Sequence, residues 1–196
     1  LNKKAKVVDH FTYCLVGDGD LMEGISYEAA SFAGNLKLGK LIVLYDANKS
    51  SMDTTTDKTF TESVASRFSA LVWHVQNVKN GKSISAINKA IVKAKKNTSI
   101  PSLIIVNTTI GDGSLLEGNP KIHSGELSKE DYEQLKRGLG IEGLPFTLLK
   151  EPAENIRNQV IERNQKKYDE WEKIVQNYKN EMSNDKKNEF QNLIYN

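Results

Sequence analysis

The sequence predicts an α/β fold: an open, mostly parallel sheet with helices on both faces, followed by a C-terminal helical segment. Two observations lead to this fold class. Short apolar runs alternate with longer stretches of helical character, which is the rhythm of strands joined by right-handed crossovers. The runs are apolar without interruption, which is typical of parallel strands covered on both faces.

Four apolar runs are interpreted as the strands of this sheet. The first, Thr12–Val16, contains β-branched and aromatic residues, ends at a glycine, and is expected to be a central, buried strand. The other three runs cover Leu41–Tyr45, Val72–Val78 and Ser102–Thr108. The turn signal Asn80-Gly81 follows the third run, and Pro101 precedes the fourth.

Helical segments lie between and after these strands. Ile25–Ala33 ends at Gly34-Asn35, a pair that can close a helix, and Ser85–Lys96 has apolar residues at helical spacing with lysines on the opposite side. Ser128–Asp131 resembles a capping box and is expected to open a helix that stops near Gly138. Further helices are predicted over 62–71 and, as one helix or two, over 153–182, with loops over 46–59 and 110–127.

The chain is expected to have two parts. Residues 1–150 form the predicted α/β domain and residues 151–196 the helical segment, with a linker between Pro145 and Pro152. From residue 150 onward, nine basic and nine acidic side chains accompany an apolar stripe, which indicates a packing helix with a charged, solvated face. The stripe consists of Trp171, Ile174, Val175, Tyr178 and Met182, continued briefly by Phe190, Leu193 and Ile194. Because the sequence starts at Leu1 rather than Met, we expect a piece of a longer protein whose domain lacks its N-terminal part.

Composition and charge argue against several classes of protein. The 27 Lys and Arg nearly balance the 25 Asp and Glu, for a net charge of +2, whereas a nucleic-acid binder needs a basic surface. We expect neither a membrane span, which takes roughly 20 apolar residues, nor a secretory leader. The single cysteine, Cys14, cannot form an internal disulfide, which fits a cytoplasmic protein. Its place within a strand predicts an inert core thiol.

The sequence GDGDLMEG, at 17–24, places polar residues at the exit of the first strand, and Asn48 follows the second strand thirty residues after Asp18. Because the carboxyl ends of neighbouring parallel strands meet at one edge of a sheet, we expect Asp18 and Asn48 to lie close together. Their oxygens are the hard ligands that Mg²⁺ prefers. Gly17 and Gly19 would let the backbone approach a diphosphate, at which a helix beginning near Met22 or Glu23 would aim its amino end.

Two other interpretations of the acidic glycine motif compete with this one: the first copy is preferred over a second copy of the pattern, and a calcium loop is rejected. A second copy of the pattern, GDGSLLEG at 111–118, also follows a strand, but Asn119-Pro120 stops any helix behind it. The residue thirty positions after Asp112 is Glu142, in a linker. A calcium loop of the EF-hand type is excluded because Met22 occupies one of its ligand positions.

The stretch GDGDLMEGISYEAASFAGNLKLGKLIVLYDANKSSMD resembles the cofactor-binding domain of transketolase, with EGISYEA and AGNLKLGKLI as its specific parts. NGKSISAINKAIVKAK, PSLIIVNTTIGDGS and a histidine-containing loop extend the resemblance over nearly all of residues 1–150. It implies the thiamine-diphosphate-binding fold and a transferase that moves a two-carbon ketol unit from a ketose phosphate to an aldose phosphate in the pentose phosphate pathway. It also implies thiamine diphosphate and Mg²⁺, or Ca²⁺ as a substitute, as cofactors. The implied partners are sugar phosphates and a second copy in a full-length homodimer.

The resemblance also implies roles for individual residues. Asp18, the Asn48 side chain and the backbone carbonyl of Ser50 match the metal ligands, and Asn48 also contacts the cofactor. Gly19 matches the glycine that lies against the diphosphate. His123 matches a catalytic histidine that touches cofactor and substrate, although the following Ser-Gly-Glu-Leu differs from the family pattern of Gly, a small residue, Pro and Leu. Acidic residues near the cofactor and between subunits correspond to Glu23 and Glu28.

Alternative functions remain open at this point. One is another thiamine-diphosphate enzyme, such as dihydroxyacetone synthase or deoxyxylulose-phosphate synthase; the second of these fits EGISYEA less well. Another is a non-catalytic fragment or interaction module that keeps the fold. In the family a glutamate from another domain activates the cofactor, so the 196-residue chain alone is expected to be inactive. His74, inside a strand, is expected to be structural, and His10 is assigned no role.

Overall fold

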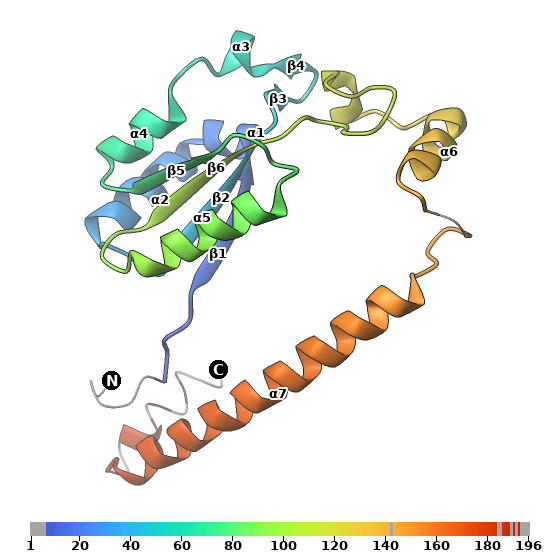
Figure 1. Cartoon of the computed structure of the whole chain (residues 1–196). Coiled ribbons are helices and arrows are strands. Elements are labelled where there is room, and N and C mark those ends of the chain that lie inside the picture. The colour runs from blue at the N-terminus through green and yellow to red at the C-terminus, as the bar shows by residue number, and fades with distance from the viewer. Residues whose placement is uncertain (1–6, 142, 184–185, 189, 191, 193–196) are drawn as a thin grey trace. The chain divides into compact units, whose positions relative to one another are not determined.

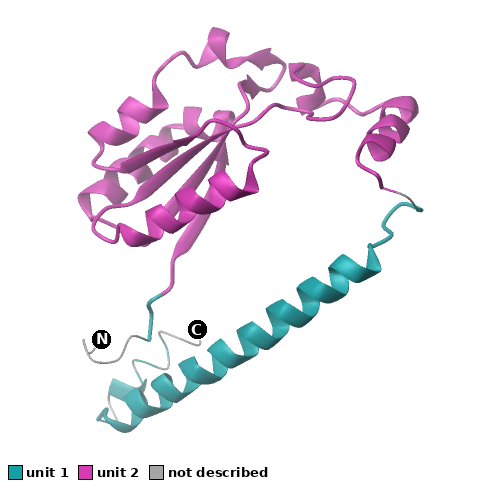
Figure 2. Ribbon diagram, viewed as in Figure 1, with its two compact units in different colours: residues 1–9, 143–196 teal, residues 10–142 magenta. Residues whose placement is uncertain are grey.

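The computed structural model describes residues 7–141, 143–183, 186–188, 190 and 192. The chain divides into two compact units, one of residues 10–142 and one of residues 1–9 with 143–196 (Figure 2). In the described part of the chain, no helix is long and apolar enough to cross a membrane.

The larger unit is built on a parallel sheet whose strand order is β1-β2-β6-β5 (Figure 1). These strands are β1 (Thr12–Gly17), β2 (Leu41–Ala47), β6 (Ser102–Asn107) and β5 (His74–Val78). In the pairing register Gly17 lies beside Asp46, and Asp46 lies beside Val106. The carboxyl ends of these three strands therefore meet at one edge of the sheet. The predicted open, parallel sheet is confirmed.

Helices cover both faces of this sheet, as predicted. Helix α2 (Gly24–Asn35) and helix α4 (Val64–Ala70) pack on one face, and α5 (Ile84–Lys96) packs on the other. Successive strand residues alternate between the two cores because side chains in a strand point to opposite faces. The first core contains Val43, Tyr45, Leu103, Ile105 and Phe68, and the second contains Ile42, Ile104, Val106, Ala90 and Ala94. This double burial explains the uninterrupted apolar runs of β2 and β6.

The first strand differs from its prediction. β1 has one neighbouring strand among the described residues and so lies at an edge of the sheet rather than at its centre. Tyr13, Cys14 and Leu15 are exposed, with Leu15 at 77%. The prediction of a core thiol at Cys14 is therefore wrong. The reason is that β1 pairs along one side only, and the described helices pack mainly against β2, β6 and β5.

The remaining elements refine the predicted boundaries. Strand β5 begins later than expected because Val72 has a φ of 65°, which no strand residue adopts. Three helices begin with a serine whose side chain accepts the backbone N–H three residues further on. These serines are Ser63 before α4, Ser83 before α5 and Ser128 before the helix α6 (Lys129–Gly138). The expected loop over 46–59 is shorter, because β2 extends to Ala47 and the remainder contains short elements. The other elements of this unit are α1 (Asp18–Met22), β3 (Ser50–Ser51), β4 (Thr54–Thr55), α3 (Thr56–Thr59) and the 3₁₀ turn η1 (Pro120–His123). They are followed by α6.

The smaller unit contains one continuous helix, α7 (Lys150–Asn180). Pro152 lies in its first turn, where a missing N–H costs no hydrogen bond, so the linker ends before this proline. Of the predicted apolar stripe, Val175 and Tyr178 are buried against Val7 and Phe190, while Ile174 is 40% exposed. The indole of Trp171 donates to the Val7 carbonyl at 2.9 Å. Leu193 and Ile194, also predicted to belong to the stripe, lie outside the described residues.

We expect Ile104→Ala to lower the free energy of unfolding by about 2–5 kcal/mol, because it empties a site at the centre of the second core. Ile84→Ala is the matched control, since Ile84, the first residue of α5, is 82% exposed. Its effect should stay within about 0.5 kcal/mol. Urea unfolding followed by circular dichroism measures both values, and similar losses in the two variants would contradict this assignment of the core.

His74 has the structural place expected of it, half-buried on β5 with Nδ1 3.1 Å from the Ser102 hydroxyl. Burial, together with the charge of Lys93, lowers the pKa of its ring below the ordinary value. The neutral ring is thus favoured in the folded state. Its contribution to stability is present above the unfolded pKa of about 6.5 and is lost as the pH falls through the lower folded pKa.

The free energy of unfolding should therefore fall as the pH drops from above about 6.5 through the lower folded pKa of His74, and His74→Gln should reduce this fall. Urea titrations at several pH values measure the difference. An unchanged pH dependence in the variant would show that His74 makes no such contribution.

Candidate functional site

A buried carboxylate lies at the carboxyl edge of the sheet. Asp18, the first residue of α1, is 4% exposed and receives three hydrogen bonds. Its Oδ2 accepts the backbone N–H groups of Asn48, at 3.2 Å, and Lys49, at 3.1 Å. Its Oδ1 accepts the hydroxyl of Tyr45. These donors compensate for burying a charge, which is costly when it has no partners.

Tyr45 is a dependable donor in this position. Burial and the hydrogen bond to Asp18 raise the pKa of the phenol well above its ordinary value, so the hydroxyl keeps its proton. Lys49 contributes through its backbone, which has a φ of 63°, in the left-handed region that is unfavourable for residues other than glycine. This turn allows two successive N–H groups to reach the same carboxylate oxygen.

The predicted site residues surround one cavity, of about 460 Å³. Asp18 and Asn48 both line it, and the Asn48 side-chain oxygen accepts the backbone N–H of Ser50 at 3.0 Å. His123, exposed at the end of η1, lines the cavity from the loop that was predicted over 110–127. The full set of predicted residues at this cavity is Gly17, Asp18, Gly19, Glu23, Asn48, Ser50 and His123. Glu28 is exposed on α2 and does not line it.

Several features of this cavity fit a cation bound together with a diphosphate. A carboxylate has about four acceptor positions, and three at Asp18 are taken, which leaves one for a cation. The Ser50 hydroxyl is buried and has no hydrogen-bond partner among the described residues. A Cβ at Gly19 would lie 3.3 Å from the Ser51 hydroxyl, which is a tight contact, so glycine leaves more room at this wall than any other residue.

The ligand chemistry points in the same direction. Among the described residues, no group of three or more His, Cys, Asp or Glu side chains could hold a metal ion. A cation at this cavity would therefore take oxygens from one carboxylate, one amide, the backbone and the phosphate groups. Such an oxygen set suits Mg²⁺, which commonly binds through one or two carboxylates and substrate phosphates.

The helix expected to begin near Met22 or Glu23 is α2, which starts at Gly24 with Glu23 as its N-cap. A short helix that was not predicted, α1, precedes it from Asp18, and the extended Glu23 separates the two. The Gly17 N–H donates to the Asp20 carboxylate at 2.7 Å, which fixes the start of α1. The Arg67 guanidinium donates to the Leu21 carbonyl at 3.0 Å, near the end of α1.

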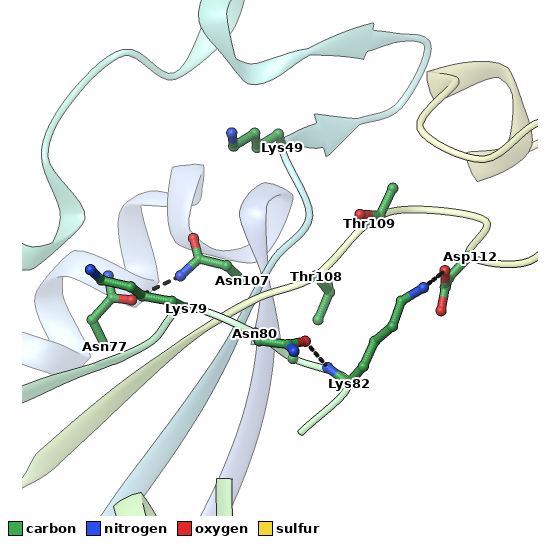
Figure 3. A pocket seen from close by; sticks show the side chains of 10 residues that line it. Lys49, Asn77, Lys79, Asn80, Lys82, Asn107, Thr108, Thr109 and Asp112 are labelled. Carbon is green, nitrogen blue, oxygen red and sulfur yellow. Dashed lines mark hydrogen bonds and ion pairs between the residues drawn. The ribbon is translucent and has the colours of Figure 1, made fainter. Parts of the chain in front are cut away.

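The second copy of the motif, at 111–118, forms a turn away from this cavity. Asp112 pairs with Lys82 at 2.6 Å, and Glu117 accepts the Gly113 N–H at 3.2 Å. Asp112 and Lys82 line a different cavity, of about 820 Å³, together with Lys49 and Thr108 (Figure 3). The carboxylates of this copy are thus engaged in the turn and its ion pair, which supports the preference for the first copy.

Sequence reasoning missed the partners of the predicted ligands. Tyr45 belongs to an apolar run and is typical of a strand residue, so its pattern carries no sign of a polar role. Asp46 was expected in a loop, but it is the penultimate residue of β2. The spacing that placed Asn48 beside Asp18 could also have indicated Tyr45 and Asp46, because these residues lie at the end of the same strand, just before Asn48.

A parallel α/β sheet with a buried carboxylate and an open, glycine-lined cavity at the carboxyl ends of its strands defines a domain of the class that binds phosphorylated cofactors. Comparison with known proteins makes this specific. The model of the family described as "Transketolase, thiamine diphosphate binding domain" matches residues 1–196, and the chain belongs to this family.

Individual relatives agree with this assignment. The chain is 45% identical over 175 residues to a transketolase of Bacillus subtilis and 44% identical over 177 residues to one of Nostoc, covering 88% and 89% of this chain. A solved structure of Pichia stipitis transketolase with sedoheptulose 7-phosphate superposes on 91% of the chain with a TM-score of 0.86 and 39% identity. Transketolase from Campylobacter jejuni covers 97% with a TM-score of 0.83 and 36% identity.

The chain corresponds to only part of these proteins. It spans 26% of the length of the Bacillus and Nostoc relatives and 27% and 29% of the two solved chains.

We expect Tyr45→Phe to lower the free energy of unfolding by about 1–3 kcal/mol, because it leaves one oxygen of a buried carboxylate without its donor. Tyr13→Phe is the control, since Tyr13 is 48% exposed on β1 and should change stability by less than about 0.5 kcal/mol. Chemical denaturation of both variants tests this, and equal effects would argue against a structural dependence of Asp18 on Tyr45.

Proposed function

We propose that this chain is the thiamine-diphosphate- and Mg²⁺-binding part of a transketolase, which transfers a two-carbon ketol unit from a ketose phosphate to an aldose phosphate. The observation that carries the proposal is Asp18, a buried carboxylate with one acceptor position left, beside Asn48 at a glycine-lined cavity. Residues 1–150 form the proposed cofactor domain, and residues 151–196 form the helical segment beyond it.

The proposed metal ligands are the Asp18 carboxylate, the Asn48 side-chain oxygen and the Ser50 backbone carbonyl, with Mg²⁺ as the ion and Ca²⁺ as a substitute. Gly17 and Gly19 bring the backbone close to the diphosphate. When bound, thiamine diphosphate supplies a nucleophilic carbon and an electron sink for breaking the carbon–carbon bond.

The other proposed residues act beside the metal. His123 holds or exchanges a proton at an oxygen of the sugar, the task of a positioned general acid or base. Glu23, exposed at the same cavity, lies beside the cofactor.

The partners follow from the same proposal. Solved relatives contain sedoheptulose 7-phosphate, fructose 6-phosphate and xylulose 5-phosphate, which supports sugar phosphates as substrates here. We place the whole protein in the cytoplasm, in the pentose phosphate pathway, as a homodimer. Because the chain spans about a quarter of its relatives, the groups that complete the site are expected to lie outside it. Ketol transfer by the 196-residue chain alone would contradict this division of the site.

Binding of the cofactor can be tested through stability. Saturating thiamine diphosphate with Mg²⁺ should raise the free energy of unfolding, by about 2.7 kcal/mol at a hundred times the dissociation constant. The gain should require both components and should disappear with a chelator. Thermal and urea unfolding with each component alone and with both together measure it.

Asp18→Ala should abolish this gain. Asp112→Ala, the equivalent change in the second copy of the motif, is the matched control and should keep it. If Asp18→Ala kept the gain, the metal assignment would be wrong. Absence of any gain in the wild-type chain would instead favour a module that keeps the fold without the cofactor.

A further inference from the structure

The Asn48 amide is hydrogen-bonded to Asp46, a residue that has no proposed contact with the metal. The side-chain nitrogen of Asn48 donates to Asp46 Oδ2 at 3.2 Å. Its side-chain oxygen faces the other way and accepts the Ser50 N–H. An amide presents either an acceptor or two donors to a cation, depending on a half-turn about its last torsion. Only the orientation with the oxygen toward the cavity can serve a metal ion.

Asp46 is itself held in place from the neighbouring strand. Its Oδ1 accepts the hydroxyl of Thr108, which directly follows β6, and the Thr108 N–H donates to the Ala47 carbonyl at 3.3 Å. Thr108 itself lines the cavity of about 820 Å³ that also contains Asp112 and Lys82 (Figure 3). The half-buried Asp46 carboxylate thus links the end of β6 to the end of β2.

We propose that Asp46 is a positioning residue for the cation site: anchored by Thr108, it holds the Asn48 amide nitrogen and so keeps the amide oxygen available to the metal. This inference rests on the proposed function, since it assumes that Asn48 is a ligand. The amide oxygen has two lone pairs, one used by Ser50 and one free for a cation. Partners that orient a metal ligand in this way commonly change metal affinity by about 10-fold to 100-fold.

The Asp46–Asn48 hydrogen bond predicts the effects of three substitutions. Asp46→Leu keeps the approximate shape but removes both acceptors, which frees the amide. Asp46→Asn removes the charge but keeps an acceptor for Asn48, while its own NH₂ group can donate to the Thr108 hydroxyl. Thr108→Val leaves Asp46 charged but unanchored, and it serves as the second disruptive variant should Asp46→Leu fail to fold.

The first measurement needs no cofactor. In ¹⁵N–¹H spectra of the metal-free chain, the Asn48 side-chain NH₂ resonances should differ from those of a solvated amide. Asp46→Leu should move them to solvated values, whereas Asp46→Asn should largely preserve them. Unchanged resonances in Asp46→Leu and Thr108→Val would overturn the proposal, whatever the chain does with thiamine diphosphate.

The second measurement is the Mg²⁺ concentration that half-saturates the stabilisation by thiamine diphosphate. We expect Asp46→Leu to raise this concentration about 10-fold or more, Thr108→Val to raise it by a smaller factor, and Asp46→Asn to stay within about 3-fold of wild type. An equal rise of this Mg²⁺ concentration in Asp46→Asn and Asp46→Leu would show that the charge of Asp46 causes the effect, and would overturn the proposal that Asp46 positions the amide. An unchanged midpoint in both disruptive variants would do the same. If thiamine diphosphate and Mg²⁺ do not stabilise the wild-type chain, the proposed function is contradicted. The Asn48 side-chain resonances then test the orientation of the amide independently.

Discussion

Burial of the Asp18 charge is the constraint on which the candidate site depends. A carboxylate that is 4% exposed would be strongly unfavourable without donors, and all three of its donors come from β2 and the turn after it. The site can therefore exist only when β1 and β2 are paired in parallel and in the observed register. Formation of the sheet and formation of the site are in this sense one event.

The same edge of the sheet gathers groups from distant parts of the sequence. His123 lines the cavity from a loop more than seventy residues beyond Asn48. The Ser124 hydroxyl, in the same loop, donates a hydrogen bond to Asp53 at 3.2 Å. Thr108, which directly follows β6, donates its hydroxyl hydrogen bond to the Asp46 carboxylate. Because parallel strands end together, each crossover returns the chain to this edge, which explains why such folds bind ligands there.

The strands that carry the candidate site differ in how deeply they are buried. β2 and β6 are buried on both faces and carry Asp46, Asn48 and Thr108 at or just beyond their ends, so these residues follow the most deeply buried strands of the sheet. β1, which delivers Asp18, is an exposed edge strand. Asp18 is nevertheless fixed in position, because its hydrogen bonds run to β2 and the turn after it rather than to its own strand.

The sequence by itself determined the order of the main strands and helices, the parallel sheet with helices on both faces, and the place of Asp18 and Asn48 at the ends of neighbouring strands. Those follow from local signals: apolar runs, the capping box at Ser128, and polar residues placed directly after strands. Ser50, Glu23 and His123 were expected at the cavity only through the resemblance to transketolase. Only the tertiary structure decided that β1 and Cys14 lie at an exposed edge, that Tyr45 serves a carboxylate, and that Asp46 rather than solvent holds the Asn48 amide. The physical reason is that strand order, register and side-chain orientation depend on pairing between residues far apart in the chain, which no local pattern records.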